Sequence, residues 1–123
     1  MGHEITLAFQ QMTEDVKQNN VEKGWRTEEG STPGRTFGDD MALLHTEVSE
    51  AFEAFRQWGL EDATEVMYSN TLPKPEGVGS EFADVLIRLI DMADRHGIDL
   101  VQEYHRKMTF NRTRPFRHGG KAL

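Results

Sequence analysis

The sequence has no cysteine and no long apolar run. Without cysteine, neither a disulfide framework nor a thiolate metal site can form. No stretch of about 18 consecutive apolar residues is present, so no segment is typical of a transmembrane helix. The first ten residues, MGHEITLAFQ, do not have the pattern of a signal peptide. We therefore expect a soluble, cytoplasmic protein with no membrane partner.

Basic residues are also fewer than acidic residues, except near the C-terminus. The 14 Lys and Arg against 21 Asp and Glu give a net charge of −7, which argues against a nucleic-acid partner. Residues 104–121 hold six of the basic residues and no acidic one, so 8 basic and 21 acidic side chains elsewhere give −13. Such a chain could bind divalent cations at one end of a site and phosphates at the other. A solvated acidic surface with a frayed basic terminus would give the same pattern.

Strand signals are almost absent, and a chain of 123 residues is expected to form one domain over residues 1–123. Apolar periodicity and helix-ending glycines predict an all-α fold of four helices. Expected N-caps are Asp39 or Asp40 for the second helix, Ser80 for the third and Asp99 for the fourth. Residues 60–79 could add a short fifth helix ahead of a Pro- and Gly-rich loop. The four helices cover about 3–23, 39 or 40 to 58, 80–95 and about 99–113.

The second helix carries glutamates in an apolar setting, in the stretch LLHTEVSEAFEAFRQWG (43–59). On a helical wheel, Glu47 falls inside an apolar arc of roughly 180°, Glu50 lies just beyond its edge, and Glu53 points away. A buried carboxylate needs a partner, and two carboxylates at i and i+3 can bind one divalent ion. The alternative is an ion pair between Glu47 and an arginine such as Arg88. The arc consists of Leu43, Leu44, Val48, Ala51, Phe52, Phe55 and Trp58.

The third helix has an apolar surface of about 220° and one narrow polar stripe. The broad apolar surface predicts at least a dimer, and we expect a homodimer or homotetramer. Taken alone, the stripe indicates a solvent face with i,i+4 pairs. However, Glu81 and Asp84 repeat the E-x-x-[DE] spacing of Glu47 and Glu50 on a neighbouring helix. Four facing carboxylates would repel one another unless Mg²⁺ lay among them. The stripe consists of Glu81, Asp84, Arg88, Asp91 and Arg95, with expected pairs Asp84–Arg88 and Asp91–Arg95.

Together, EVSE (47–50) and EFAD (81–84) resemble the E-x-x-E … E-x-x-D signature of the MazG-like all-α nucleoside triphosphate pyrophosphohydrolases. Three further segments are similar to parts of that family, particularly its phage and actinobacterial members: KGW (23–25), KPEGVGSEFADV (74–85) and KMTFNRTRPFRHGGK (107–121). The resemblance spans about residues 23–121. Thirty residues separate Glu50 from Glu81, slightly more than is usual in the family, which we attribute to an enlarged 60–79 connection.

The resemblance implies a bundle completed by association of copies. It also implies an enzyme that hydrolyses an NTP or dNTP at the α-phosphorus, releasing pyrophosphate and a monophosphate. By the same resemblance, Glu47, Glu50, Glu81 and Asp84 are the catalytic residues. They would bind Mg²⁺, with Mn²⁺ as a substitute, through hard oxygen ligands.

Substrate contacts are expected from the basic tail and from two tryptophans. Lys107, Asn111 and Arg114 share one helical face, and the resemblance implies that they contact phosphate and sugar. Arg117 and Lys121 would fold over the site. The alternatives are a disordered tail or one that docks on a neighbouring subunit.

Trp25 and Trp58 bracket the first acidic motif, where related enzymes stack aromatic rings on the base. Trp58 also lies in the apolar arc, so a core position explains it equally well. His45, at the margin of the arc, has no E-x-x-H partner and is expected at the surface.

Two other classes of protein were weighed. A di-iron or di-manganese bundle needs E-x-x-H motifs on two helices, and the acidic motifs here contain no histidine, so this class is strongly disfavoured. A non-catalytic helical module, which senses nucleotides or binds a partner, is the alternative to the enzyme.

Overall fold

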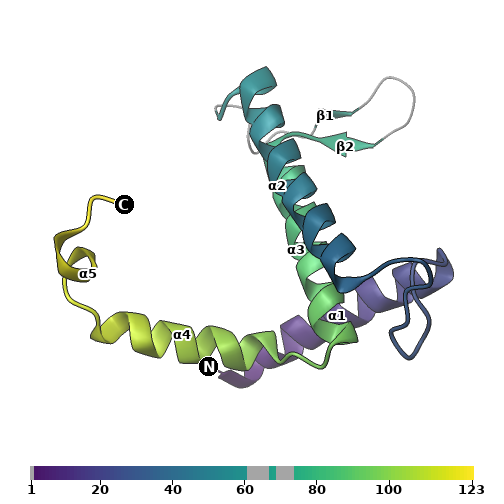
Figure 1. The fold of residues 1–123 in the computed structure, drawn as a ribbon, viewed down its shortest axis with the longest axis horizontal. Coiled ribbons are helices and arrows are strands. Elements are labelled where there is room, and N and C mark those ends of the chain that lie inside the picture. The colour runs from purple at the N-terminus through teal and green to yellow at the C-terminus, as the bar shows by residue number, and fades with distance from the viewer. Residues whose placement is uncertain (1, 61–66, 69–73) are drawn as a thin grey trace.

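The computed structural model describes residues 2–60, 67–68 and 74–123, and nearly all of them are helical (Figure 1). The all-α class is confirmed. None of the helices in these ranges is long and apolar enough to cross a membrane. The helices are α1 (Gly2–Glu22), α2 (Phe37–Trp58), α3 (Val78–Arg95), α4 (Leu100–Thr113) and the short α5 (Arg117–Gly120); the strands are β1 (Met67–Tyr68) and β2 (Pro75–Glu76).

The start of α2 corrects the expected cap. Thr36, and neither Asp39 nor Asp40, is the N-cap. The Thr36 hydroxyl accepts from the Asp39 amide at 3.1 Å, and the Asp39 carboxylate accepts from the Thr36 amide at 2.9 Å. This reciprocal capping box satisfies two helix-end donors at once, so the helix begins four residues earlier than a cap at Asp40 would allow. Asp40, freed from capping, turns into the core and is only 3% exposed.

Of the N-caps predicted for α3 and α4, only that of α4 is confirmed. Ser80 is not the cap of α3, because the helix begins at Val78 and the Ser80 hydroxyl donates to the Pro75 carbonyl at 3.1 Å. Gly77 takes the cap position with φ of 113°, a conformation that glycine adopts readily. Asp99 caps α4 as expected, accepting from the Gln102 amide at 3.0 Å.

The connection before α3 contains a small antiparallel pair in which Met67 lies opposite Glu76 and Tyr68 opposite Pro75. The possible helix within 60–79 is therefore wrong for residues 67–68, which are extended. The rest of that expected helix, residues 61–66 and 69, lies outside the described residues.

α2 and α3 form a helix pair, against which α1 packs, and α4 follows α1 (Figure 1). α2 and α3 lie side by side and antiparallel, since Asp40 meets Arg95 while Glu47 meets Arg88. α1 packs across α3, and the main contact of α4 is with α1. From there α4 and α5 lead away from the α2–α3 pair. A single chain therefore encloses its core mainly with α1, α2 and α3.

The core is small and partly charged, and it contradicts only the interpretation of the α3 polar stripe as a solvent face, which the stripe taken alone indicated. This stripe does not face solvent, because Glu81 and Asp91 are 7% and 6% exposed. Apolar residues on the other side of α3 are instead open to solvent, and Phe82 is 62% exposed. The buried apolar residues are Ala51, Ala54, Val78, Ile90, Met92 and Ala93.

Ion pairs explain how a charged stripe can pack inward. The Arg95 guanidinium binds Asp91 at 2.7 Å and Asp40 at 2.8 Å. Arg26, which follows α1, binds Asp91 at 3.4 Å and Asp94 at 2.8 Å. A buried charge is tolerated when it is paired and hydrogen-bonded, so this cluster links α1, α2 and α3 without an apolar contact.

Candidate metal centre

The antiparallel pairing of α2 and α3 brings the two acidic motifs together. Glu47, Glu50 and Glu81 each place one carboxylate oxygen within 4.8 Å of the other two. Oxygens that share one cation at about 2.0–2.6 Å lie within such distances of one another. The predicted convergence of these three glutamates is therefore present in the fold. Asp84 lies on the wall of the adjoining cavity, and its negative charge acts on Glu81.

Glu81 is the most unusual carboxyl group of the cluster. Its Oε2 is buried and has no hydrogen-bond partner among the described residues. Burial, followed by the negative charges of Asp84 and Glu50 and by a hydrogen bond between the Glu81 and Asp84 carboxyl groups, raises the pKa of Glu81 from 4.5 to about 7. A buried polar atom without a hydrogen-bond partner destabilises the folded state, by about 1–3 kcal/mol in protein mutational series. A bound cation would remove that cost, so Glu81 is the feature that points to a ligand.

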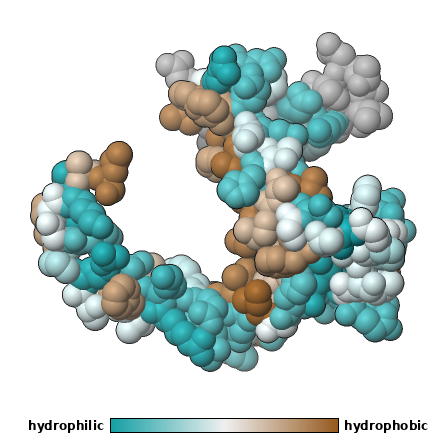
Figure 2. Space-filling model, viewed as in Figure 1, coloured by the Kyte–Doolittle hydropathy of each residue, from teal (hydrophilic) through white to brown (hydrophobic). Residues whose placement is uncertain are grey.

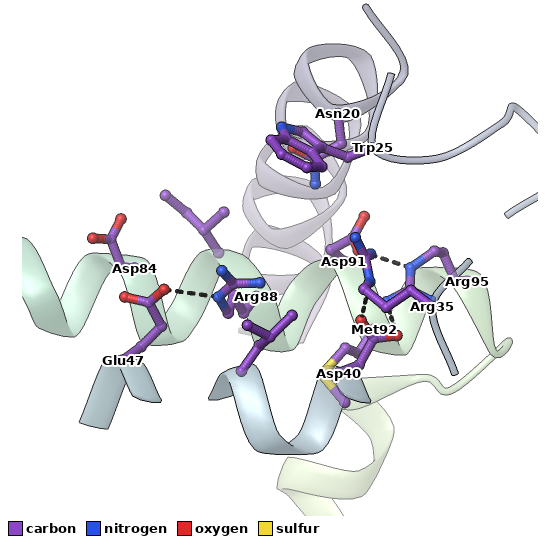
Figure 3. A pocket seen from close by; sticks show the side chains of 12 residues that line it. Asn20, Trp25, Arg35, Asp40, Glu47, Asp84, Arg88, Asp91, Met92 and Arg95 are labelled. Carbon is purple, nitrogen blue, oxygen red and sulfur yellow. Dashed lines mark hydrogen bonds and ion pairs between the residues drawn. The ribbon is translucent and has the colours of Figure 1, made fainter. Parts of the chain in front are cut away.

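Glu47 has the arginine partner that the sequence offered as the alternative. Arg88 Nε donates to Glu47 Oε1 at 2.8 Å across the α2–α3 contact (Figure 3). The expected i,i+4 pair between Asp84 and Arg88 is not among the ion pairs of the described chain, because Arg88 reaches α2 instead. The other expected pair, Asp91 with Arg95, is confirmed. The ion-pair and metal-ligand interpretations of Glu47 are compatible, because one carboxylate oxygen can accept from Arg88 while the other binds a cation.

A cavity of about 460 Å³ extends from the carboxylates toward the end of α1 (Figure 3). Glu47 and Asp84 lie at its acidic end, and Trp25 and Asn20 lie together on another wall. Trp25 is 60% exposed, so its ring is open to a ligand. The remaining lining residues are Arg35, Asp40, Leu43, Ile87, Arg88, Asp91, Met92 and Arg95.

The other expected substrate residues do not line this cavity. Trp58 is half-buried at the end of α2 and is not one of the buried core residues. Lys107 and Asn111 lie on α4, Arg114 is its C-cap with an extended backbone, so the helical face expected to include it ends before it, and Lys121 follows α5; all lie on the part of the chain that leads away from the cluster (Figure 1). Within one chain, the basic tail and the carboxylates are therefore not brought together. His45 is exposed, as expected.

Sequence reasoning missed three residues around Trp25. Asn20 and Arg35 line the cavity, and Arg26 is buried beside it with its guanidinium on Asp94. Because the Arg26 side chain binds Asp94 on α3, the backbone of the neighbouring Trp25 is held against α3. This contact positions the indole. The only sequence signal was the position of Arg26 directly after KGW, and it says nothing of a partner 68 residues away.

No family model matches the chain, and neither a curated protein nor a solved structure is significantly similar to it. The MazG-like resemblance thus depends on the motifs themselves, and the function has to be argued from the site.

The raised pKa of Glu81 predicts a stability effect in EDTA. The folded state holds this proton up to about pH 7, whereas the unfolded chain releases it near 4.5. Stability is therefore lost as pH rises from 4.5 to 7. At pH 8, Glu81→Gln should be more stable than wild type by about 3 to 4 kcal/mol, since the shift is about 2.5 pKa units at about 1.4 kcal/mol per unit. Urea unfolding at pH 4.5 and 8 measures this difference.

Addition of Mg²⁺ at pH 8 should stabilise wild type and leave Glu81→Gln unchanged. Glu53→Gln is the matched control, because its side chain is 67% exposed, and it should behave as wild type. Equal stability of wild type and Glu81→Gln at both pH values would contradict the buried, unpaired carboxylate.

Arg88 is expected to compete with a cation for Glu47. Without nucleotide, Arg88→Gln should bind Mn²⁺ about two- to five-fold more tightly, since partly exposed ion pairs contribute about 0.5–1 kcal/mol. Titration calorimetry measures the affinity, and Arg56→Gln, which removes the exposed partner of Glu53, should leave it unchanged. Weaker binding in Arg88→Gln would mean that the guanidinium orients Glu47 for the ion instead.

Proposed function

We propose that this chain is a metal-dependent nucleoside triphosphate pyrophosphohydrolase, which converts an NTP or dNTP and water into a monophosphate and pyrophosphate. One observation carries the proposal: three glutamates from two helices converge, and the buried one has an oxygen with no hydrogen-bond partner among the described residues. A structural acidic cluster would leave that oxygen paired or exposed.

The donor set fits a hard divalent cation. Glu47, Glu50 and Glu81, with Asp84 next to them, offer only carboxylate oxygens, and Mg²⁺ and Mn²⁺ prefer such ligands. The chain has no cysteine, and no histidine of the described residues joins the cluster, so softer metals are not favoured. When bound, the ion would neutralise the phosphate charge and lower the pKa of a water.

The residues of the chain have separable tasks in this proposal. The carboxylates set where the polyphosphate can lie, because its anionic oxygens cannot approach them without a cation. One carboxylate of the set accepts the proton of the attacking water. As the water oxygen bonds to the α-phosphorus, the bond to the bridging oxygen breaks, and that oxygen leaves with pyrophosphate. Catalysis of this kind depends mainly on positioning and charge neutralisation.

The cavity supports a nucleotide as the substrate class. Its volume of about 460 Å³ lies in the range of small-molecule sites. The exposed Trp25 ring offers a stacking surface for a base, an interaction of about 1–3 kcal/mol. Asn20 lies beside it and offers both amide donors and an acceptor to a base or sugar. Arg88 lies between this wall and the carboxylates, where a guanidinium can bind a phosphate oxygen once Glu47 binds the cation.

Phosphorus NMR of the products tests the proposal. Purified protein is incubated with each common NTP and dNTP, first with Mg²⁺ and then with EDTA. Pyrophosphate and a monophosphate that form only with Mg²⁺ are the expected products. The choice of the α-phosphorus comes from the family resemblance, so phosphate and a diphosphate would overturn that choice. No turnover by folded protein would favour the nucleotide-sensing or partner-binding module.

A further inference from the structure

We propose that Asn20 selects the base of the nucleotide, and that the site favours bases with an exocyclic amino group, cytosine and adenine, over their keto counterparts. The Asp91 carboxylate holds the Asn20 amide so that its carbonyl oxygen remains available to the base as an acceptor. This inference deepens the proposed function and rests on it, because it takes the base to lie against the Trp25 indole.

Trp25 is an exposed ring on a firmly held backbone. It is 60% exposed, whereas the side chain of the next residue, Arg26, is 2% exposed and binds Asp94 at 2.8 Å. The Trp25 amide donates to the main-chain carbonyl of Asn20 at 2.9 Å, which links the ring to the residue beside it. A base stacked on this ring would therefore meet the Asn20 side chain at a defined position.

Two neighbours fix the orientation of the Asn20 amide. Its NH₂ group donates to the Asp91 carboxylate, and its carbonyl oxygen accepts from Asn19 at 3.3 Å. Figure 3 shows the amide nitrogen on the side that faces α3, where Asp91 lies. An amide oxygen can accept two hydrogen bonds, so one remains for a ligand in the cavity that Asn20 lines.

Turning the amide over would let it donate to a keto oxygen, but Asp91 opposes the turn. The Asn20 oxygen would then lie against the Asp91 carboxylate, which would also lose the hydrogen bond that it now accepts. Two acceptors in contact repel each other, and a buried carboxylate that loses a donor is destabilised. A keto oxygen that approached the unturned NH₂ group would lie beside the same carboxylate. An amino group meets neither obstacle.

Two matched pairs of bases differ mainly in this group. Cytosine has an amino group where uracil has an oxygen, and adenine has one where hypoxanthine has an oxygen. Uracil and hypoxanthine also carry a ring N–H, but it lies next to a carbonyl oxygen, which would then approach Asn20 or Asp91. Because a polar site rejects a ligand that leaves its groups unpaired, we expect kcat/KM to favour CTP over UTP, and ATP over ITP, by about 10- to 100-fold.

A second surface could take a flat ring, but it cannot select a base in this way. Figure 2 shows hydrophobic surface along the α2–α3 pair. The described residues that line the groove there are all aliphatic or aromatic, among them Val48, Phe52 and Phe82. These side chains offer no hydrogen bond to a base edge. Base selection is therefore assigned to the cavity that Trp25 and Asn20 line.

Turnover of the matched triphosphates by Asn20→Ala tests the selection. The preference for CTP over UTP should fall to within about three-fold, mainly because KM for CTP rises while kcat changes little. Gln18→Ala is the control, because Gln18 lies on the same helix, is exposed and donates to Glu22 at 3.2 Å. It should keep the wild-type preference. A preference that survives in Asn20→Ala, or that is absent from wild type, would overturn the proposal.

Nucleoside binding tests the same selection without turnover. Cytidine and uridine carry no charge and need no metal ion to approach the cavity. The chain has two tryptophans, so Trp58→Phe leaves Trp25 as the only fluorescent reporter. Cytidine should quench it with a Kd about ten-fold below that of uridine, and Asn20→Ala should remove the difference. Equal quenching by both nucleosides, or by neither, would overturn the proposal. If cytidine binds selectively but no triphosphate is hydrolysed, the proposed function has failed and the base selection stands.

Asp91→Asn tests whether Asp91 sets the orientation. The uncharged amide can donate or accept, so Asn20 would be free to turn, and cytidine and uridine should bind within about two-fold of each other. Circular dichroism checks that the variant is folded; if it is not, Asn20→Ala, which removes no ion pair, decides the proposal. Folded Asp91→Asn protein that still binds cytidine ten-fold more tightly would overturn the role of Asp91.

Discussion

Glu50→Gln is expected to lose Mg²⁺-dependent turnover while the fold is retained. Glu50 contributes an oxygen to the cluster with Glu47 and Glu81, and the amide of glutamine is a weaker, uncharged ligand. Mutation of residues that only orient metal ligands commonly lowers metal affinity or activity by about 10- to 100-fold. Glu50 is itself an expected ligand, so we expect Glu50→Gln to lower kcat/KM by more than about 100-fold. Because Glu50 is exposed, the variant should unfold at the wild-type temperature in EDTA.

Glu53→Gln is the control for this prediction. It removes one negative charge three residues along the same helix, from a side chain that is 67% exposed and that pairs, within the part of the chain the structure describes, with Arg56. Its turnover should match wild type within about two-fold, since an exposed ion pair contributes little. Full activity in Glu50→Gln would remove that residue from the site. An equal loss in both variants would show a general charge effect on α2 rather than ligation.

The carboxylate cluster could be predicted because each of its two acidic motifs lies within a single helix. Residues at i and i+3 share a helix face wherever the helix is placed, so Glu47 with Glu50 and Glu81 with Asp84 follow from spacing alone. Antiparallel pairing of the two helices then brings the motifs together. The same helix-wheel argument showed that Glu47 needs a partner, and Arg88 is that partner in the structure.

The orientation of α3 could not be predicted in this way. Periodicity divides the helix into an apolar surface and a polar stripe, but it does not say which of them faces the chain's own core. The stripe packs inward because Arg26 and Asp40 pair with Asp91 and Arg95, at sequence separations of 65 and 55 residues. Such partners are set by tertiary structure. Several apolar residues of α3 that were predicted for a core are instead exposed, and Phe82 is 62% exposed.

The cap of α2 was wrongly predicted for a related reason, although the cap of α4 at Asp99 was predicted correctly. Thr36, Asp39 and Asp40 are all good cap residues, so the sequence offers three neighbouring starts for α2. The structure uses Thr36 as the cap and Asp39 as its reciprocal partner. Asp40 is then available to Arg95, which means that the cap and the buried ion pairs depend on each other.

Arg95→Met is expected to destabilise the protein by about 3–5 kcal/mol, the usual cost of removing one partner of a buried ion pair. The Arg95 side chain is only 2% exposed, and its removal would leave Asp40 with Arg35 alone and Asp91 with Arg26 alone as cationic partners. Burial alone would raise the pKa of Asp91, but hydrogen bonds from Arg95, Asn20 and Arg26 hold it below its ordinary value of 3.8. Urea unfolding at pH 7 measures the loss. Arg106→Met, an exposed arginine paired with Glu103, should change stability by less than about 0.5 kcal/mol.

The pH dependence separates this cause from a simple loss of packing. In wild type, the lowered pKa of Asp91 gives stability that is present above pH 3.8 and is lost as pH falls through the lower, folded-state value. In Arg95→Met the two carboxylates, each left with one cation, should be protonated more readily, so the deficit relative to wild type should shrink as the solution is acidified. Adding Asp40→Asn to Arg95→Met should recover part of the loss at pH 7, because it removes the buried negative charge that Arg95 no longer balances. A deficit that is independent of pH and unchanged by Asp40→Asn would mean that the methylene packing of Arg95, rather than its charge, holds α3 against α2.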